Sequence, residues 1–95
     1  MIDLIVTLQV NPGMEAKAEG LLRILEQETM ENDPGCLRYQ WYKAEQPGLY
    51  YLLERWTDQG ALDAHRKSAH LAKILPQLAE CSAERVANTK LTRLE

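Results

Sequence analysis

The chain lacks the features that would indicate a polyanionic or membrane partner. Its eleven Lys and Arg are interspersed with fourteen Asp and Glu, for a net charge of −3, and no run of basic residues supplies the clustered positive charge that nucleic-acid binding needs. No apolar stretch approaches the about 20 residues that cross a bilayer. Residues 1–6 lack the positive leader of a signal peptide. We therefore expect a cytoplasmic protein with no nucleic-acid partner and no membrane partner.

Motifs for metals and redox cofactors are also missing. There is no His-Glu-x-x-His, no Cys-x-x-Cys and no Gly-x-Gly-x-x-Gly after a strand. His65 and His70 are five residues apart, about 140° around one continuous helix, which predicts that they do not share a face. Cys36 and Cys81 are far apart and are expected to be reduced packing residues. We expect no metal and no cofactor, so any redox chemistry must use the electrons of the substrate.

The patterns that are present alternate between the periods of strands and helices. Apolar residues at every second position predict strands, and apolar residues every three to four positions predict helices. Gln46-Pro47-Gly48-Leu49 fits a type II turn between two of the strands. The predicted elements are strands at 2–10, 36–44, 50–56 and 83–94, a helix at 14–32, and a helix from 57 or 58 to 65 that continues after Ser68.

Two expectations concern the faces of these elements. On the strand at 36–44, Leu37, Tyr39 and Trp41 are expected to share one face. In the helical segment after Ser68, Pro76 is expected to cause a kink or a break. The apolar stripe predicted to be buried there consists of Leu71, Ile74, Leu75 and Leu78.

The order of elements is that of a split βαβ unit. We therefore predict a single α+β domain over residues 1–95 with a ferredoxin-like βαββαβ fold, a four-stranded antiparallel sheet and two helices on one face. The other face would carry Ile5, Tyr42, Tyr51 and Leu53. Because exposed apolar patches often mark interfaces, we predict a face-to-face homodimer.

Four short segments carry a resemblance to a known family. They are Asp-Pro-Gly-Cys-Leu-Arg-Tyr at 33–39, Leu-Glu-Arg-Trp at 53–56, Ala-Leu-Asp-Ala-His at 61–65 and Ser-Ala-His at 68–70. Together they resemble the antibiotic-biosynthesis-monooxygenase family, with Ala69 where many members have proline. The resemblance covers nearly the whole chain. It implies a dimeric α+β barrel, with a pocket between sheet and helices, and cofactor-independent oxygenases of polyphenols and quinols.

His65 is the first candidate for chemistry, because its unperturbed pKa of about 6.5 suits a base near neutral pH. It shares a helix face with Ala61 and Leu62 and should point toward the sheet. The alternative is a histidine at the core edge, bonded to a backbone carbonyl or to Glu54. Glu54 could orient His65, or it could be a hydrogen-bonding group at a dimer interface. His70 could assist at a pocket rim, although an exposed, inert side chain is favoured there.

Three aromatic residues, Trp56, Tyr39 and Trp41, are candidates for contact with a flat substrate, with core packing as the alternative for each. The leading interpretation is a cofactor-independent monooxygenase that oxidises a small aromatic quinol or polyphenol with O₂. His65 would be the base, assisted by Glu54 and His70. A small-molecule isomerase or mutarotase and a non-catalytic dimeric binding protein are the alternatives. A polar pocket would favour the isomerase, and an aromatic slot the oxygenase.

Overall fold

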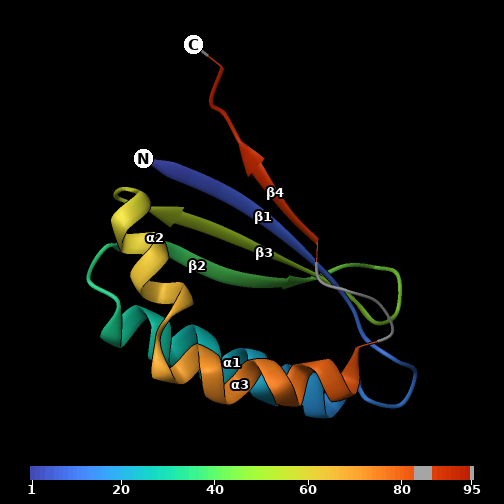
Figure 1. The fold of residues 1–95 in the computed structure, drawn as a ribbon. Coiled ribbons are helices and arrows are strands. Elements are labelled where there is room, and N and C mark those ends of the chain that lie inside the picture. The colour runs from blue at the N-terminus through green and yellow to red at the C-terminus, as the bar shows by residue number, and fades with distance from the viewer. Residues whose placement is uncertain (83–86, 95) are drawn as a thin grey trace.

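The computed structural model describes residues 1–82 and 87–94. Its elements are β1 (Ile2–Gln9), α1 (Glu15–Asn32), β2 (Cys36–Lys43), β3 (Leu49–Trp56), α2 (Gln59–Arg66), α3 (Ala69–Cys81) and β4 (Ala87–Leu91). The strands form one layer, α1 and α3 lie together as a second layer, and α2 lies at one end of the sheet (Figure 1). This is the ferredoxin-like α+β fold that the sequence predicts.

The sheet has the strand order β2-β3-β1-β4, and all neighbouring strands are antiparallel. Leu4, Val6 and Leu8 of β1 are buried on the helix side, because alternate residues of a strand point to one face. Helix α1 covers them with the stripe Ala18, Leu21, Leu22, Leu25 and Thr29. The core therefore lies between the sheet and the helices, and the opposite face of the sheet is left uncovered.

An irregularity at the start of β2 changes which residues share its inner face. The register with β3 shifts between Cys36 and Arg38, which makes Leu37 the extra residue of a β-bulge. A bulge interrupts the alternation, so Cys36 and Tyr39 are both buried while Leu37 is 47% exposed. The prediction that Leu37 shares a face with Tyr39 and Trp41 is wrong for this reason.

The turn between β2 and β3 has the predicted type II geometry. Gly48 has a φ of +78°, and the N–H of Leu49 donates to the carbonyl of Gln46 at 3.2 Å. A Cβ on Gly48 would lie 2.7 Å from the carbonyl oxygen of Val10. Glycine is therefore required both for the backbone conformation and for the close approach to the end of β1.

Side-chain caps start the two helices that follow β3. Asp58 Oδ1 accepts the N–H of Ala61 at 2.8 Å, and Ser68 Oγ accepts the N–H of Leu71 at 3.3 Å. These caps satisfy backbone donors that have no partner within the helix. Because α2 ends at Arg66 and Ser68 begins a new helix, the chain changes direction between α2 and α3.

Helix α3 runs without a break through Pro76. A proline removes one N–H···O bond, and the carbonyl left without that donor belongs to Ala72, an exposed residue that water can reach. The predicted break is therefore absent. The predicted buried stripe also lacks one member, because Leu75 is 46% exposed.

No helix of the described residues is long and apolar enough to span a membrane.

The predicted fourth strand is present as Ala87–Leu91, and residues 83–86 and 95 lie outside the described residues. All five residues of β4 are exposed. The strand lies beside β1, on the side of the sheet away from α1 and α3 (Figure 1). On the uncovered sheet face, Ile5, Tyr51 and Leu53 are half-buried and Tyr42 is 45% exposed. The structure therefore places apolar side chains on a sheet face that no helix of residues 1–82 and 87–94 covers.

Candidate functional site

A cavity of about 270 Å³ lies between the sheet and the helices. Most of its wall consists of Leu and Val side chains from the strands and helices, together with Tyr39 and Trp41 of β2. The polar residues of the wall are Glu54, His65, Arg66 and Asn88. Ligand pockets usually measure roughly 300–1,000 Å³, so this cavity suits a small, largely apolar molecule. Two of the three aromatic candidates, Tyr39 and Trp41, are thus in this wall.

His65 reaches the cavity wall from the last turn of α2, and its side chain is only 4% exposed. Its Nδ1 lies 2.7 Å from Oδ2 of Asp33. If the carboxylate accepts the Nδ1–H, the neutral ring carries its lone pair on Nε2. No hydrogen bond among the described residues uses Nε2. Nε2 is therefore the His65 nitrogen whose lone pair is not engaged by the described residues.

Neighbouring rings fix the plane of the His65 imidazole. The ring centroid of Trp56 lies 4.7 Å away in a tilted arrangement, and that of Tyr39 lies 5.3 Å away, edge to face. Burial lowers the pKa of His65 below its usual 6.5, and the bond to Asp33 opposes this effect. The ring is therefore neutral at pH 7, which is the form that a general base requires.

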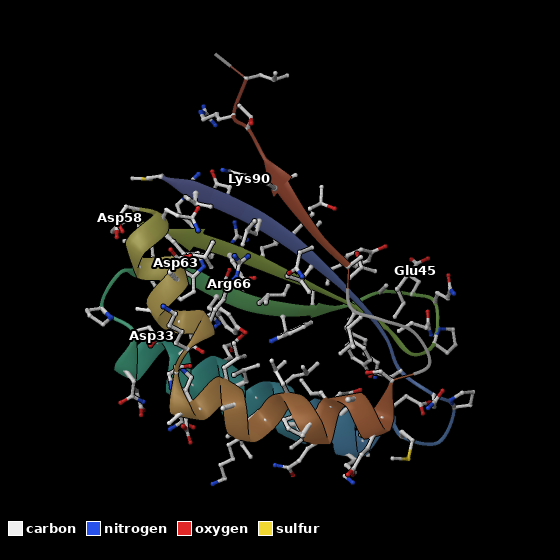
Figure 2. All side chains as sticks on the ribbon, in the orientation of Figure 1. Asp33, Glu45, Asp58, Asp63, Arg66 and Lys90 are labelled. Carbon is white, nitrogen blue, oxygen red and sulfur yellow. The ribbon has the colours of Figure 1, made fainter. Side chains whose placement is uncertain are left out.

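Asp33 is the site residue that the sequence analysis does not single out, since it appears there only in the segment at 33–39 that carries the resemblance. Oδ2 of Asp33 also lies 2.9 Å from Nε2 of His70. Figure 2 shows Asp33 beside the connection between α2 and α3. One signal was available: Asp33 is the C-cap of α1, and an acidic residue is electrostatically unfavourable at a helix C-terminus. A carboxylate in that position indicates a partner elsewhere in the fold.

The two histidines converge, contrary to the prediction that they do not share a face. That prediction assumed one continuous helix, whereas α2 ends at Arg66 and α3 begins at Ala69. The turn between them brings the two ring centroids to 5.8 Å. The side chain of His70 is 8% exposed, so the prediction that His70 is exposed is wrong.

Glu54 bonds within its own strand instead of to His65. Its Oε1 accepts the indole N–H of Trp56 at 3.0 Å, and Glu54 is 7% exposed. Burial raises the pKa of Glu54, and the bond from Trp56 opposes this effect. The prediction that Glu54 orients His65 is wrong, because Asp33 occupies that position. Trp56 is fully buried and lies outside the cavity wall, which agrees with core packing and not with contact to a substrate.

The two cysteines are free and buried. Burial raises the pKa of the Cys36 thiol to about 11, so it is protonated at neutral pH and a poor nucleophile. Burial also holds the pKa of the Tyr39 phenol well above its usual value. Tyr39 therefore presents a neutral aromatic ring to the cavity, and His65 is the group in the wall that is suited to accept a proton at pH 7.

Comparison with known proteins gives consistent results. The model of the family described as "Antibiotic biosynthesis monooxygenase" matches residues 1–77. A Mycobacterium tuberculosis protein named "Putative monooxygenase Rv0793" is 30% identical over 94 residues, which are 99% of this chain and 92% of the relative. Its solved structure superposes with a TM-score of 0.90 at 29% identity, covering 99% of this chain and 95% of the relative.

Two further solved structures share the fold. A conserved protein of Methanosarcina mazei is 31% identical with a TM-score of 0.90, over 98% of this chain and 92% of the other. The crystal structure of an antibiotic biosynthesis monooxygenase has a TM-score of 0.93 at 23% identity, with both chains fully covered. At 23% identity, the similarity to the antibiotic biosynthesis monooxygenase structure concerns the fold alone.

Proposed function

Because the chain belongs to the antibiotic biosynthesis monooxygenase family, we propose that it oxidises a small aromatic quinol or polyphenol with O₂ and needs no cofactor. The observation that carries this proposal is the apolar cavity with Tyr39, Trp41 and His65 in its wall. Asp33 holds Nδ1 of His65 at 2.7 Å, which leaves Nε2 to face the reaction. A carboxylate behind a histidine fixes both the orientation and the tautomer of the ring.

The chemistry needs one proton acceptor and a site that excludes water. Ground-state O₂ reacts slowly with closed-shell molecules, but a phenolate is electron-rich enough to give it one electron. His65 takes the phenolic proton at Nε2, and the resulting semiquinone and superoxide combine to form a C–O bond. Loss of water then gives the hydroxylated quinone. Quinol plus O₂ thus becomes hydroxyquinone plus water, and the quinol supplies all the electrons. The apolar wall keeps these intermediates away from bulk water.

One observation favours a second candidate, a proton-transferring isomerase. Glu54 and His65 are both in the wall of the same cavity, and isomerases need one or two such groups. The raised pKa of Glu54 allows this carboxyl group to donate as well as accept a proton. The mostly apolar wall favours the oxygenase, because a sugar-like substrate needs many polar partners.

Oxygen consumption with a panel of hydroquinones and anthrones tests the proposed function. We expect uptake above the buffer rate with at least one substrate, and with ¹⁸O₂ one labelled oxygen atom in the product. Formation of hydrogen peroxide without labelled product would make the protein an oxidase and overturn the monooxygenase proposal. No uptake with any substrate would also overturn it and turn attention to isomerisation or non-catalytic binding.

We also propose that a second copy of the chain covers the outer face of the sheet. Ile5 and Leu53 pair across β1 and β3 at the centre of that face, and a chain of 95 residues has a small core of its own. Sedimentation equilibrium should give twice the chain mass, and Leu53→Glu should give the monomer mass. Ile24→Glu changes a residue of α1 that is 47% exposed, and it should leave the mass unchanged. A monomeric wild type would refute the dimer.

A further inference from the structure

Asp33, His65 and His70 form a compact cluster beside the cavity. Their donor atoms, Oδ2, Nδ1 and Nε2, all lie within 4.8 Å of one another. The side chains are 12%, 4% and 8% exposed, respectively. Asp33 follows the end of α1, His65 is in α2 and His70 is in α3. The three ligand atoms therefore come from separate parts of the chain.

Two imidazole nitrogens and one carboxylate oxygen are a ligand set that zinc and its neighbours in the first transition row prefer. We propose that Asp33, His65 and His70 bind one divalent transition-metal ion of the zinc class, with water completing the coordination. The short spacings that usually reveal such sites are absent here, because residue 33 is far from the histidines in sequence and a turn lies between the histidines. The fold alone brings the three ligands together.

Hydrogen bonds hold the three side chains of the cluster together, and the ion must replace them. Asp33 Oδ2 lies 2.7 Å from Nδ1 of His65 and 2.9 Å from Nε2 of His70. Ligand atoms about 2.0–2.1 Å from a tetrahedral zinc are about 3.3 Å apart. The Asp33 side chain must therefore move back by roughly half an ångström. The two imidazole nitrogens lie within 4.8 Å of each other, so the histidine side chains must also move toward the ion.

The protons move in the same event. A neutral imidazole carries one N–H, and a metal bound at Nδ1 of His65 requires that proton to be on Nε2. His70 undergoes the opposite change, since its Nε2 binds the metal and its proton goes to Nδ1. The two hydrogen bonds to Asp33 are therefore the interactions that the ion replaces.

This tautomer change has a consequence that rests on the proposed function. With the metal on Nδ1, Nε2 of His65 carries the proton, so it is an N–H donor and cannot accept the phenolic proton. Binding of the ion therefore switches the base off, and chelation restores it. Zinc is then a reversible inhibitor of oxygen uptake that binds Nδ1 of His65, outside the cavity that holds the substrate.

Binding itself is tested without any substrate. Protein dialysed against EDTA is titrated with ZnCl₂ by calorimetry, and its melting temperature is measured with and without the ion. We expect one zinc per chain and a melting temperature that rises with zinc, because a ligand that binds only the native state stabilises it. Excess EDTA should reverse the rise. Co²⁺ in place of zinc should give the visible absorption of a low-coordinate site.

Variants assign the ligands. His70→Ala and Asp33→Asn should each lose the zinc-dependent rise and the Co²⁺ absorption. Asp63→Asn removes an exposed carboxylate from α2 and should retain both. No heat, no rise and no Co²⁺ absorption in the wild type would overturn the site, as would an unchanged response in both ligand variants. Where oxygen uptake is observed, zinc binding without inhibition would refute the switch alone. An inactive protein that binds zinc would refute only the proposed function.

Discussion

Replacing His65 by Gln is expected to lower the rate of oxygen uptake by about 10²–10⁴-fold, the usual contribution of a general base. A glutamine amide can still donate an N–H toward Asp33 Oδ2, which now accepts from Nδ1 at 2.7 Å. It cannot take a proton from a phenol. The variant should therefore fold and bind substrate while losing the proton-transfer step. Initial rates of uptake at saturating quinol, with EDTA in the buffer, give the comparison.

Two further variants separate catalysis from packing. His70→Gln changes the second imidazole that contacts Asp33, and His70 lies outside the cavity wall. We therefore expect the rate of oxygen uptake to fall by less than about tenfold, below the usual contribution of a general base. Asp33→Asn can turn an amide N–H toward Nδ1, which forces the His65 proton onto Nε2, so its loss should approach that of His65→Gln. Equal rates for wild type and His65→Gln would remove this residue from the mechanism.

The pH profile provides a readout that a purely structural role would not change. Burial lowers the pKa of His65 below 6.5, and only the neutral ring is a base. Uptake by the wild type should therefore be constant near pH 7 and fall as the pH drops through a value below 6.5. The residual activity of His65→Gln should lack this fall. A fall of the same size in the variant would assign the titration to another group.

The local parts of this fold are predictable because their signals repeat along the chain. The alternation of Leu4, Val6 and Leu8 fixes the inner face of β1 without any reference to the rest of the protein. The helix caps at Asp58 and Ser68 likewise follow from residue type. The bulge at Leu37 is not predictable in this way, because it depends on the register with a neighbouring strand.

The candidate site is predictable only in part, for the same physical reason. His65 is placed on the inner face of its helix by its own neighbours, which is local information. Its partner Asp33 lies 32 positions earlier, and no periodicity links the two. The bond from Trp56 to Glu54 shows the opposite case. Glu54 and Trp56 are two positions apart and share a strand face. Their hydrogen bond could therefore be predicted from this short segment alone.

Replacing Gly35 by Ala is expected to destabilise the fold and to impair the site together. A Cβ at this position would lie 2.3 Å from Cβ of Ala61 and 2.9 Å from Oγ1 of Thr57. The N–H of Thr57 also donates to the carbonyl of Gly35 at 2.9 Å, which holds the two segments together. Relief therefore requires α2 to move. We expect a loss of about 1–3 kcal/mol in the free energy of unfolding, measured by urea denaturation.

The same displacement should reduce activity, because Ala61 lies one helical turn before His65 and Gly35 lies two residues after Asp33. A shift of about 1 Å between a base and its reactant can cost about 10²-fold in rate. Gly20→Ala is the matched control. Gly20 is inside α1, and among the described residues nothing beyond its chain neighbours and its own helix backbone lies within 4 Å of the new Cβ. This change should stabilise the protein by about 0.5–1 kcal/mol.

Combining Gly35→Ala with Ala61→Gly tests the cause directly. The second change removes the Cβ at 2.3 Å, although glycine within α2 costs about 1 kcal/mol by itself. If the clash with Ala61 is the cause, the double variant should be less destabilised than the sum of the two single variants, and oxygen uptake should partly recover. Strictly additive losses would mean that α2 does not rest on Gly35, and that the position of His65 is set from elsewhere.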